Sequence, residues 1–532
     1  MTQASNTPTS SSDRLTQRIS AATMAHVDAF ATDTISNESG LLYNGIIEKY
    51  KNDPNRIYIR HRPAVNIAVP DSVGDGKGRG VYWWSANSTR YFMNDDVIYK
   101  GSYAAPCSMY NGGTPDTAIV SGASKVYFAE WSSANEDYLF IIDPENNDIF
   151  CIASAADTTV INIGDRTTGT GAPFHASDSW DFTDLNAFLG DSNLADGLAV
   201  LDTYLFLGLL DGKIINSNVD DWLNWNALNF TTAERSQDQL LYLGKQQDHV
   251  VAMGGQSIEF FYDNANATGS PLSNRTDIAH REGLSFGQAV WEKGDTIFFQ
   301  AIDSGGDFYL ASLSNFQVTH FNNPTMQSYV WLSRYTQDMT AIMSGFSVGG
   351  HVYVILTTLT TAGAGAYSLV YDAAYDAWYQ WETTCNSNTE FQVIGFMLRA
   401  ATNDNRPQAI LRSGDICYIQ DDFLPTDDVD GGASVNITMK SIVDSFDANT
   451  TETKFMHSIN YVGNRVASAQ NLTVEYSDDN GATWVSRTLD LADKTQINRL
   501  GKFDYRKFRF TIVGTQTVRF EGIDVCFSQG DH

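Results

Sequence analysis

The sequence lacks several features that whole classes of protein require, and positive charge is the scarcest of them. It has 34 Lys and Arg against 63 Asp and Glu, which gives a formal net charge of −29. Such a chain has no broad basic face with which to grip nucleic acid. An acidic surface provides solubility or suits a salt-rich habitat, and it equally suits a wall along which DNA passes without adhering.

Long apolar runs are absent too. No stretch approaches the ~20 consecutive apolar residues of a membrane-spanning helix. Residues 1–12 are polar and lack the cationic start and apolar core of a secretory signal, so we expect no signal peptide. We therefore expect a protein that is made in the cytoplasm and does not contact a membrane.

Cysteine is scarce, and its spacing is uninformative for metal binding. The five cysteines are far apart, odd in number and include no Cys-x-x-Cys pair. This argues against a disulfide framework and a structural zinc site, and it favours buried, reduced thiols. They are Cys107, Cys151, Cys385, Cys417 and Cys526.

Motifs of hydrolytic chemistry are also missing. The nine histidines include no His-x-His or His-Glu-x-x-His pattern, and the chain has no Gly-x-Ser-x-Gly elbow. The glycine-rich segment Gly74–Gly80 runs into a strand-like segment, Val81–Trp84, so we interpret it as a turn rather than a phosphate loop. We expect no enzymatic activity, no catalytic residues, and no cofactor or metal.

What the sequence does contain is a series of seven similar strand pairs. Each begins with alternating apolar residues, and the first strands are anchored at positions 82, 127, 204, 250, 297, 352 and 408. The spacings are 45, 77, 46, 47, 55 and 56 residues, and a β-propeller blade repeats every 40–50 residues or so. We predict an all-β protein with an irregular six- or seven-bladed β-propeller; the alternative is a two-sheet β-sandwich chain.

Interruptions in the series of strand pairs indicate an N-terminal region before the propeller and an insertion within it. Residues 1–64 should form a disordered tail, a short helix over residues 13–30 and an irregular arm, and residues 65–420 or so should form the propeller. The 77-residue spacing marks an insertion at about 163–190. That segment is polar and Gly-rich, so we expect a loop projecting from one blade.

A second break separates the propeller from the C-terminal region. Residues 421–433 hold five Asp, one Pro and two Gly, without the spacing of a Ca²⁺ loop, and we interpret them as an acidic linker. Residues 434–532 contain six strands that mostly alternate with period two. Such strands bury one face, so we expect a C-terminal antiparallel β-sandwich.

One motif in the C-terminal region is structural in character. It matches the Ser-x-Asp-x-Gly-x-Thr-Trp pattern of the sialidase Asp box, a hairpin in which the Asp accepts backbone N–H bonds and the Trp folds back. A sialidase would repeat the box and add three arginines, a tyrosine nucleophile and a carboxylate, so a single copy favours a structural turn. Its residues are Ser477, Asp479, Gly481, Thr483 and Trp484.

The middle of the chain resembles the packaged-DNA stabilisation proteins of short-tailed bacteriophages, the tail hub or nozzle proteins below the portal. The most specific shared pattern comprises Gly254, Gly255, Ser257, Ile258 and Glu259. Further segments that resemble the family are Gly208–Asn218, Trp222, Trp225, Phe230–Asp238, Asp248–Tyr262, Glu282–Gln288, Asp295–Phe299, Leu472–Gly481 and Arg506–Phe510. The similarity spans roughly residues 200–530, and the N-terminal 60 residues match less well.

This resemblance implies a structural virion protein in the phage tail. It implies a homohexameric ring of propeller subunits that extends the DNA channel, retains the packaged genome and lets double-stranded DNA pass at ejection. The implied partners are copies of itself, the adaptor or portal-proximal ring, and tail fibre, tailspike or needle proteins. The alternative is a sialidase-like glycan-active or glycan-binding propeller. Its candidate glycan contacts would be tryptophans on exposed loop tips, namely Trp83, Trp84, Trp222, Trp225, Trp378 and Trp381.

Charge suggests how such a ring would meet DNA. We expect a pore lining that is acidic or neutral, with the genome held by a constriction of loops, because basic contacts would slow ejection. The insertion at about 163–190 is a candidate either for that constriction or for contact with a tail neighbour. The densest basic cluster should then face an acidic neighbouring subunit as a subunit contact; it comprises Lys502, Arg506, Lys507 and Arg509.

Overall fold

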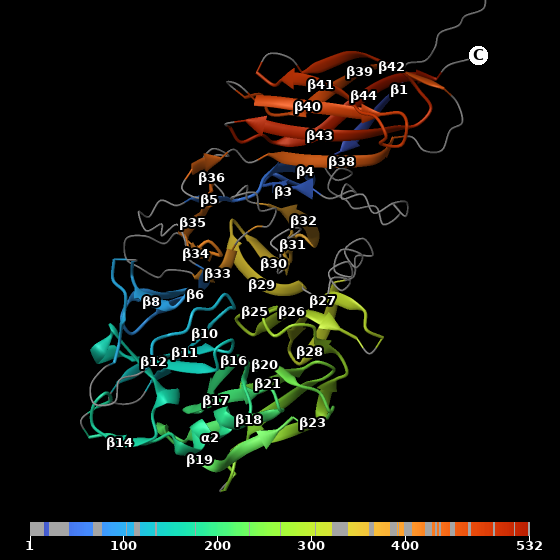
Figure 1. Ribbon diagram of the computed structural model, residues 1–532. Coiled ribbons are helices and arrows are strands. Elements are labelled where there is room, and N and C mark those ends of the chain that lie inside the picture. Colours follow the sequence, from blue (N-terminus) through green and yellow to red (C-terminus); the bar gives the residue numbers. More distant parts are fainter. Residues whose placement is uncertain are drawn as a thin grey trace, which may run out of the picture.

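The protein is almost entirely β-structure. The computed structural model describes residues 15–20, 42–66, 77–102, 104–110, 117–132, 136–175, 177–233, 235–266, 268–303, 305–321, 339–360, 367–382, 391, 393–397, 407–420, 428–430, 433–435, 438–446, 453–466, 470–492, 495–514 and 516–529. These residues include one α-helix, α2 (Thr183–Asp191), and two 3-10 turns, Ser154–Ala156 and Ile163–Asp165. Within the same residues, no helix has the length and apolar character needed to cross a membrane. The predicted all-β propeller is confirmed and forms the lower part of Figure 1.

The propeller consists of antiparallel units that follow one another along the chain. Unit 1 contains β6 (Gly78–Trp84), β7 (Thr89–Asn94) and β8 (Val97–Lys100), and unit 2 contains β10 (Tyr127–Ser132), β11 (Asp137–Asp143), β12 (Asp148–Ala153) and β13 (Thr159–Asn162). Unit 3 contains β16 (Leu194–Leu201), β17 (Tyr204–Leu209), β18 (Lys213–Asn218) and β19 (Asp221–Thr232). Unit 4 contains β20 (Leu240–Gln246), β21 (His249–Gly254), β22 (Ile258–Asp263) and β23 (Leu272–His280). Unit 5 contains β25 (Val290–Lys293), β26 (Thr296–Ile302), β27 (Phe308–Ser314) and β28 (Gln317–Phe321), and unit 6 contains β29 (Met339–Val348), β30 (His351–Thr360), β31 (Tyr367–Asp372) and β32 (Ala377–Trp381). Two short strands extend units 2 and 5: β9 (Ser108–Met109) pairs with β13, and β24 (Gly283–Leu284) pairs with β26.

An N-terminal strand completes the last unit and closes the ring. Unit 7 contains β33 (Val393–Met397), β34 (Gln408–Leu411) and β35 (Ile416–Gln420), and its fourth strand is β5 (Ala64–Asn66), which pairs antiparallel with β35. Strand β33 packs against β29 on one side and against β6 of unit 1 on the other. The first and last units are therefore neighbours, although more than 300 residues separate the strands β6 and β33 in the sequence.

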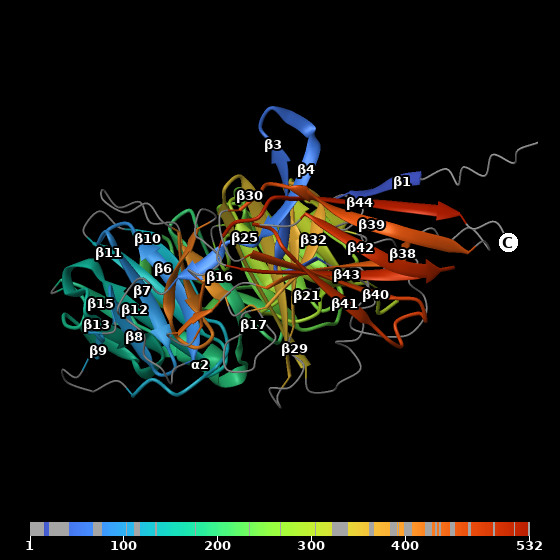
Figure 2. The ribbon, with the colours of Figure 1, turned by 90° about the horizontal axis from the view of Figure 1, so that it is seen from above.

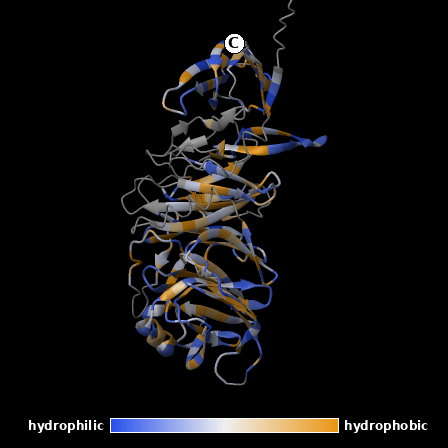
Figure 3. Ribbon diagram, turned by 90° about the vertical axis from the view of Figure 1, so that its right-hand side faces the viewer, coloured by the Kyte–Doolittle hydropathy of each residue, from blue (hydrophilic) through white to orange (hydrophobic). Residues whose placement is uncertain are grey.

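Packing of the units against one another explains their continuous apolar strands. In β11, Tyr138, Phe140 and Ile142 belong to one buried cluster, whereas Leu139 and Ile141 belong to another. A strand that lies between two neighbouring units buries both faces and therefore carries an unbroken apolar run. Figure 3 shows the hydrophobic residues concentrated on the strands and hydrophilic ones on connecting turns.

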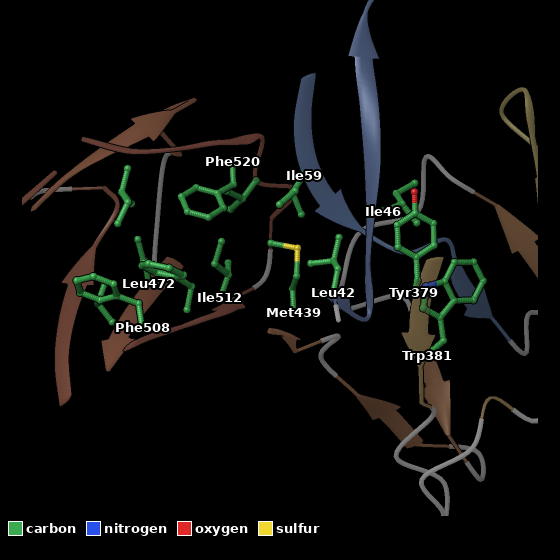
Figure 4. Packing of buried hydrophobic residues seen from close by; sticks show 14 of the residues in the cluster. Leu42, Ile46, Ile59, Tyr379, Trp381, Met439, Leu472, Phe508, Ile512 and Phe520 are labelled. Atoms are coloured by element: carbon green, nitrogen blue, oxygen red, sulfur yellow. The ribbon is translucent and has the colours of Figure 1, made fainter. Parts of the chain in front are cut away.

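The C-terminal strands form two antiparallel sheets in the upper part of Figure 1. One contains β38 (Met439–Phe446), β40 (Gln470–Ser477), β41 (Val485–Asp490) and β43 (Arg506–Gly514). The other contains β1 (Leu15–Ser20), β3 (Gly45–Tyr50), β4 (Asp53–His61), β39 (Lys454–Gly463), β42 (Gln496–Phe503) and β44 (Phe520–Gln529). Their inward side chains share one core, which contains Leu472, Phe508, Ile512 and Phe520 (Figure 4).

This core continues into the propeller through the N-terminal segment. Strand β2 (Leu42–Tyr43) pairs with β32 of unit 6 and with β38, so the two regions share a continuous sheet. In Figure 4, Leu42 and Met439 lie between the C-terminal side chains and Tyr379 and Trp381 of unit 6. The C-terminal region is thus fixed to the propeller by buried contacts.

The N-terminal helix expected over residues 13–30 is wrong for the part that the structure describes. Residues 15–20 form strand β1, which pairs with β44 in an unbroken register from Leu15↔Phe527 to Ser20↔Gly522. The available edge of β44 decides the outcome: a full backbone ladder outweighs a weak helical pattern, and Ile19 is buried in the shared core. Residues 13, 14 and 21–30 lie outside the described residues.

The insertion at about 163–190 is not a plain projecting loop. It forms β14 (Thr168–Thr170), β15 (Ser179–Asp181) and all but the last residue of α2, and β15 pairs with the outer strand β19 of unit 3. Phe174 and Phe182 are buried against Trp222, and Trp180 is buried against Phe174, so aromatic packing folds a segment whose composition is typical of a loop. It lies on the rim of unit 3, away from the strands that meet at the axis.

The acidic linker contains part of a small hairpin. Strands β36 (Asp428–Asp430) and β37 (Ala433–Val435) pair with each other, and the remaining residues of 421–433 lie outside the described part. None of the four described cysteines, Cys107, Cys151, Cys417 and Cys526, takes part in a disulfide.

Candidate functional site

The first strands of the units converge on a central channel. A cavity of about 220 Å³ lies there, lined from β6, β10, β20, β25, β29 and β33. Ionisable and hydroxyl side chains gather at this axis, and we call them the channel cluster. They are Lys125, Tyr127, Asp196, Tyr242 and Glu292.

Lys125 connects opposite sides of the channel. Its Nζ donates hydrogen bonds to the carbonyl oxygens of Val290 at 3.0 Å and Met343 at 3.3 Å, which belong to units 5 and 6. The Tyr242 hydroxyl donates to Glu292 Oε1 at 2.9 Å, which joins units 4 and 5. These bonds tie together strands that are remote in the sequence.

Crowding by protein atoms shifts the pKa values of the cluster. Burial raises the pKa of Asp196 to about 7, although a hydrogen bond with Tyr127 and the charge of Lys125 oppose the rise. Burial likewise raises the pKa of Glu292 and lowers the pKa of Lys125 to about 8. Asp196 is half-buried and Glu292 is exposed, so close surrounding protein rather than complete closure causes the shifts.

Chemically, the cluster can hold a proton near neutral pH and bind the units together. A carboxyl group with a pKa near 7 exchanges protons readily at that pH. These residues belong to no recognisable sequence motif and were not predicted as site residues, although their position carries a signal. Each lies in, or just before, the first strand of its unit, and the first strands line the axis of a propeller.

The Asp-box residues form a closed hairpin turn between β40 and β41. The Ser477 hydroxyl donates to Asp479 Oδ1 at 2.7 Å, and the backbone N–H of Thr483 donates to the same oxygen at 2.8 Å. Trp484 Nε1 donates to the carbonyl oxygen of Gly481 at 3.0 Å, and Gly481 has φ +93°, a conformation that favours glycine. These polar groups are engaged within the turn itself.

The family-like motif at residues 254–259 also serves the fold. Glu259 is buried at the start of β22, where its carboxylate accepts hydrogen bonds from Asn274 Nδ2 at 2.6 Å and the Arg235 backbone N–H at 3.0 Å. Asp238 accepts the Gln256 backbone N–H at 2.6 Å and lies against Gly254, where a Cβ would approach Asp238 Oδ2 to 2.4 Å. The motif therefore fastens the segment before unit 4 to the β21–β22 turn.

Ile258 and Ser257 of that motif are buried, and Gly255 lies against the next unit. A Cβ on Gly283 would collide with the Gly255 backbone at 2.1 Å, so the turn and β24 pack backbone to backbone. Small residues at this place permit the close contact.

The basic cluster is not a single exposed surface, which corrects the expected subunit contact for Arg506. That side chain is 1% exposed, pairs with Asp478 through Nε–Oδ1 at 2.6 Å and Nη2–Oδ2 at 2.7 Å, and donates to the Leu500 carbonyl at 2.9 Å. Arg509 stacks on the Trp484 ring, 3.8 Å from its centroid. Lys502 is exposed and Lys507 half-buried, so the cluster divides between an internal arginine and surface lysines.

Most tryptophans considered for glycan contact belong to the core. Five of the six are buried, namely Trp84, Trp222, Trp225, Trp378 and Trp381, whereas Trp83 is half-buried. In the described residues no group of three or more His, Cys, Asp or Glu is placed to hold a metal ion.

The chain matches no family model and no curated protein. Among solved structures, it is similar to the extracellular domain of a hybrid two-component system from B. thetaiotaomicron, with 8% identity, 90% of this chain and 60% of that chain covered, and a TM-score of 0.39. YCF48 bound to D1 peptide shares 11% identity over 66% of this chain and 96% of that chain, with a TM-score of 0.33. A glycoside hydrolase shares 10% identity over 86% of this chain and 99% of that chain, with a TM-score of 0.25. Likenesses this weak carry no argument about function.

Proposed function

We propose that the protein is a structural component of a bacteriophage tail, a nozzle or hub that forms a ring below the portal and adaptor. In this role it extends the DNA channel, retains the packaged genome and lets it pass at ejection. The protein would be made in the host cytoplasm and incorporated into the virion without enzymatic activity. Its resemblance to the tail-nozzle family at residues 254–259 motivates the assignment.

The observation that carries the proposal is how the motif residues are used. Asp479 is engaged within its own hairpin, and Glu259 and Asp238 hold a turn to a neighbouring segment. A catalytic carboxylate needs a side chain within reach of a substrate, and these carboxylates are committed to neighbouring backbone and side-chain groups. Such use is expected of a protein whose work is mechanical.

Electrostatics supports the same role. A formal charge of −29 per copy disfavours DNA adhesion, and Arg506, at the centre of the densest basic cluster, is neutralised internally by Asp478. A wall that DNA must slide past benefits from few exposed phosphate contacts, because each adds a salt-dependent attraction.

Electron microscopy of the purified protein, alone and with tail partners, tests the ring directly. We expect closed rings with a central opening, and we expect no tight, salt-sensitive binding to duplex DNA at physiological ionic strength. A protein that stays monomeric with adaptor and tail proteins present would contradict the role, and so would a map that places Lys502 and Lys507 against DNA in the lumen.

One pocket favours a second candidate, a glycan-binding propeller. A cavity of about 250 Å³ between units 1 and 7 is lined by residues that include Trp83, Arg90, Gln408 and Tyr418. An aromatic face beside amide and guanidinium groups is suited to a sugar ring. Glycan binding that Trp83→Ala abolishes, with the fold intact, would favour this candidate over the tail role.

A further inference from the structure

Strand β1 is attached to the rest of the molecule in an unusual way. Its backbone ladder is formed with β44 alone among the described strands, and six consecutive pairs join the two. On the same edge, β4 contributes one further pair, Ile59↔Phe520. Without β1, residues 522–527 of β44 would present an open sheet edge. Figure 2 shows β1 beside β44 at the margin of the C-terminal region.

Two described side chains of β1 make specific contacts with the rest of the molecule. Ile19 is 4% exposed and enters the shared core. On the other face, Arg18 pairs with Asp524 through Nε–Oδ1 at 2.7 Å and Nη2–Oδ2 at 3.1 Å. Together with the ladder, these contacts define a site that any copy of β1 fits, whichever chain supplies it.

The connection that follows β1 is longer than a path within one subunit requires. Ser20 lies opposite Gly522, two residues from the pair that Ile59 forms with Phe520. Leu42, where the described chain resumes, packs in the same buried cluster as Ile19 and Ile59; Figure 4 shows Leu42 and Ile59. Residues 21–41 provide 21 residues for the return from Ser20 to Leu42. A fully extended chain of that length reaches ~70 Å, so the connection is long enough to reach a neighbouring subunit.

We propose that β1 is exchanged between copies, so that the β1 strand of one subunit completes the β44 edge of the next. Exchange of an identical element is a low-cost route to oligomers, because the contacts are those of the closed monomer. It also suits subunits that each carry a charge of −29 and repel one another. Backbone hydrogen bonds do not depend on side-chain charge, and Arg18 adds a local attraction to an acidic edge.

The register offers a direct test, because Thr16 lies opposite the native thiol of Cys526. Thr16 and Cys526 lie two residues from Arg18 and Asp524 respectively, so they share the face of that ion pair. Directly opposed residues of an antiparallel pair have Cα atoms ~4.5–5.5 Å apart, a separation that a disulfide accepts. A donor variant carries Thr16→Cys and Cys526→Ser, and the acceptor is the unchanged protein with a different tag.

The two forms are co-expressed, purified as the assembled oligomer, oxidised mildly and denatured without reductant. The donor carries the cysteine introduced by Thr16→Cys, and only the acceptor carries Cys526. A disulfide between these two thiols can therefore form only between copies, so exchange predicts a covalent donor–acceptor dimer. The matched control is a donor with Gln17→Cys and Cys526→Ser. Its new thiol lies opposite Val525 and should give only the background of the other cysteines.

The single variant Thr16→Cys completes the test. Exchange predicts a ladder of covalent multimers in denaturing gels. A monomer with an internal disulfide, combined with no mixed dimer, would show that β1 stays in its own subunit and would overturn the proposal. Absence of any disulfide involving Cys526 would also overturn it, because the strand pairing itself would then be wrong.

This inference rests on the proposed ring only in requiring a homo-oligomer, and the two can fail separately. Rings that contain only internal disulfides would reject the exchange and leave the tail role standing. Mixed covalent dimers in a protein that forms no closed ring would support the exchange and count against the tail role.

Discussion

His351 and Asp372 form a buried pair where unit 6 meets the N-terminal hairpin of β3 and β4. His351 Nδ1 lies 2.5 Å from Asp372 Oδ2, and His351 Nε2 lies 3.2 Å from Glu48 Oε1. Tyr353 and Tyr375 stack near the imidazole, with ring centroids 5.2 Å and 4.5 Å away. Burial by itself lowers the pKa of His351, but hydrogen bonds and attraction to the two carboxylates outweigh it and raise the pKa to about 9.

This pair predicts a pH-dependent stability. Because the folded pKa lies above the unfolded value, the imidazolium contributes fully below pH ~6.5, and its contribution is lost as pH rises through about 9. We expect the free energy of unfolding to fall by about 1–3 kcal/mol across that window. His351→Gln should flatten this slope in denaturant titrations, whereas His175→Gln, at an exposed position, should leave it. A free energy of unfolding of the wild-type protein that does not change between pH 6 and pH 9 would contradict the prediction.

The channel cluster predicts a stabilising substitution. Asp196 has a pKa raised to about 7, so its ionisation in the folded protein opposes folding, and stability falls as pH rises from ~4 to about 7. Asp196→Asn mimics the protonated carboxyl and should raise the free energy of unfolding at pH 8 by about 1–3 kcal/mol, with little effect at pH 4. The control is Asp96→Asn at an exposed turn. Equal effects of Asp196→Asn at both pH values would refute the electrostatic explanation.

Alanine substitutions at Arg506 and Lys502 should change the stability of the protein by different amounts, although both residues belong to one basic cluster. Arg506→Ala removes a buried guanidinium that pairs with Asp478 and the Leu500 carbonyl, so we expect a loss of about 2–3 kcal/mol. Lys502→Ala, at an exposed site, should change stability by less than about 0.5 kcal/mol. Urea unfolding of both variants measures the difference; similar small losses would show that Arg506 is not an internal support.

The Asp-box turn should contribute to the stability of the protein and should have no role in the hydrolysis of a glycan. Hydrogen bonds from the Thr483 hydroxyl and backbone, and from Ser477, lower the pKa of Asp479 to about 2. Asp479→Ala should reduce the thermal midpoint above pH ~4, where the carboxylate is charged in both folded and unfolded protein, and Asp479→Asn should reduce it less. Neither variant should alter hydrolysis of a fluorogenic sialoside, which we expect at background for all forms. Wild-type turnover that Asp479→Ala removes would overturn this expectation.

Local patterns predicted much of what is formed locally. The spacing and alternation of apolar residues predicted the propeller, because a strand between two packed units must bury both faces, as β11 does. The Asp-box turn followed from eight consecutive residues, since Ser477 and Thr483 both donate hydrogen bonds to Asp479 within a single hairpin. Such interactions need no partner from elsewhere in the chain.

The sequence by itself therefore determined the fold class and the turns, and tertiary structure decided the rest. Strand β1 exists because β44 offers an edge about 500 residues away, and Arg506 is internal because Asp478 and Leu500 lie beside it after folding. The insertion folds because its aromatic residues meet Trp222. The channel cluster forms only when the ring closes and brings Lys125 to the carbonyls of Val290 and Met343. Each outcome depends on which distant group occupies an edge, a cavity or an axis, and that is set by long-range packing rather than by local pattern.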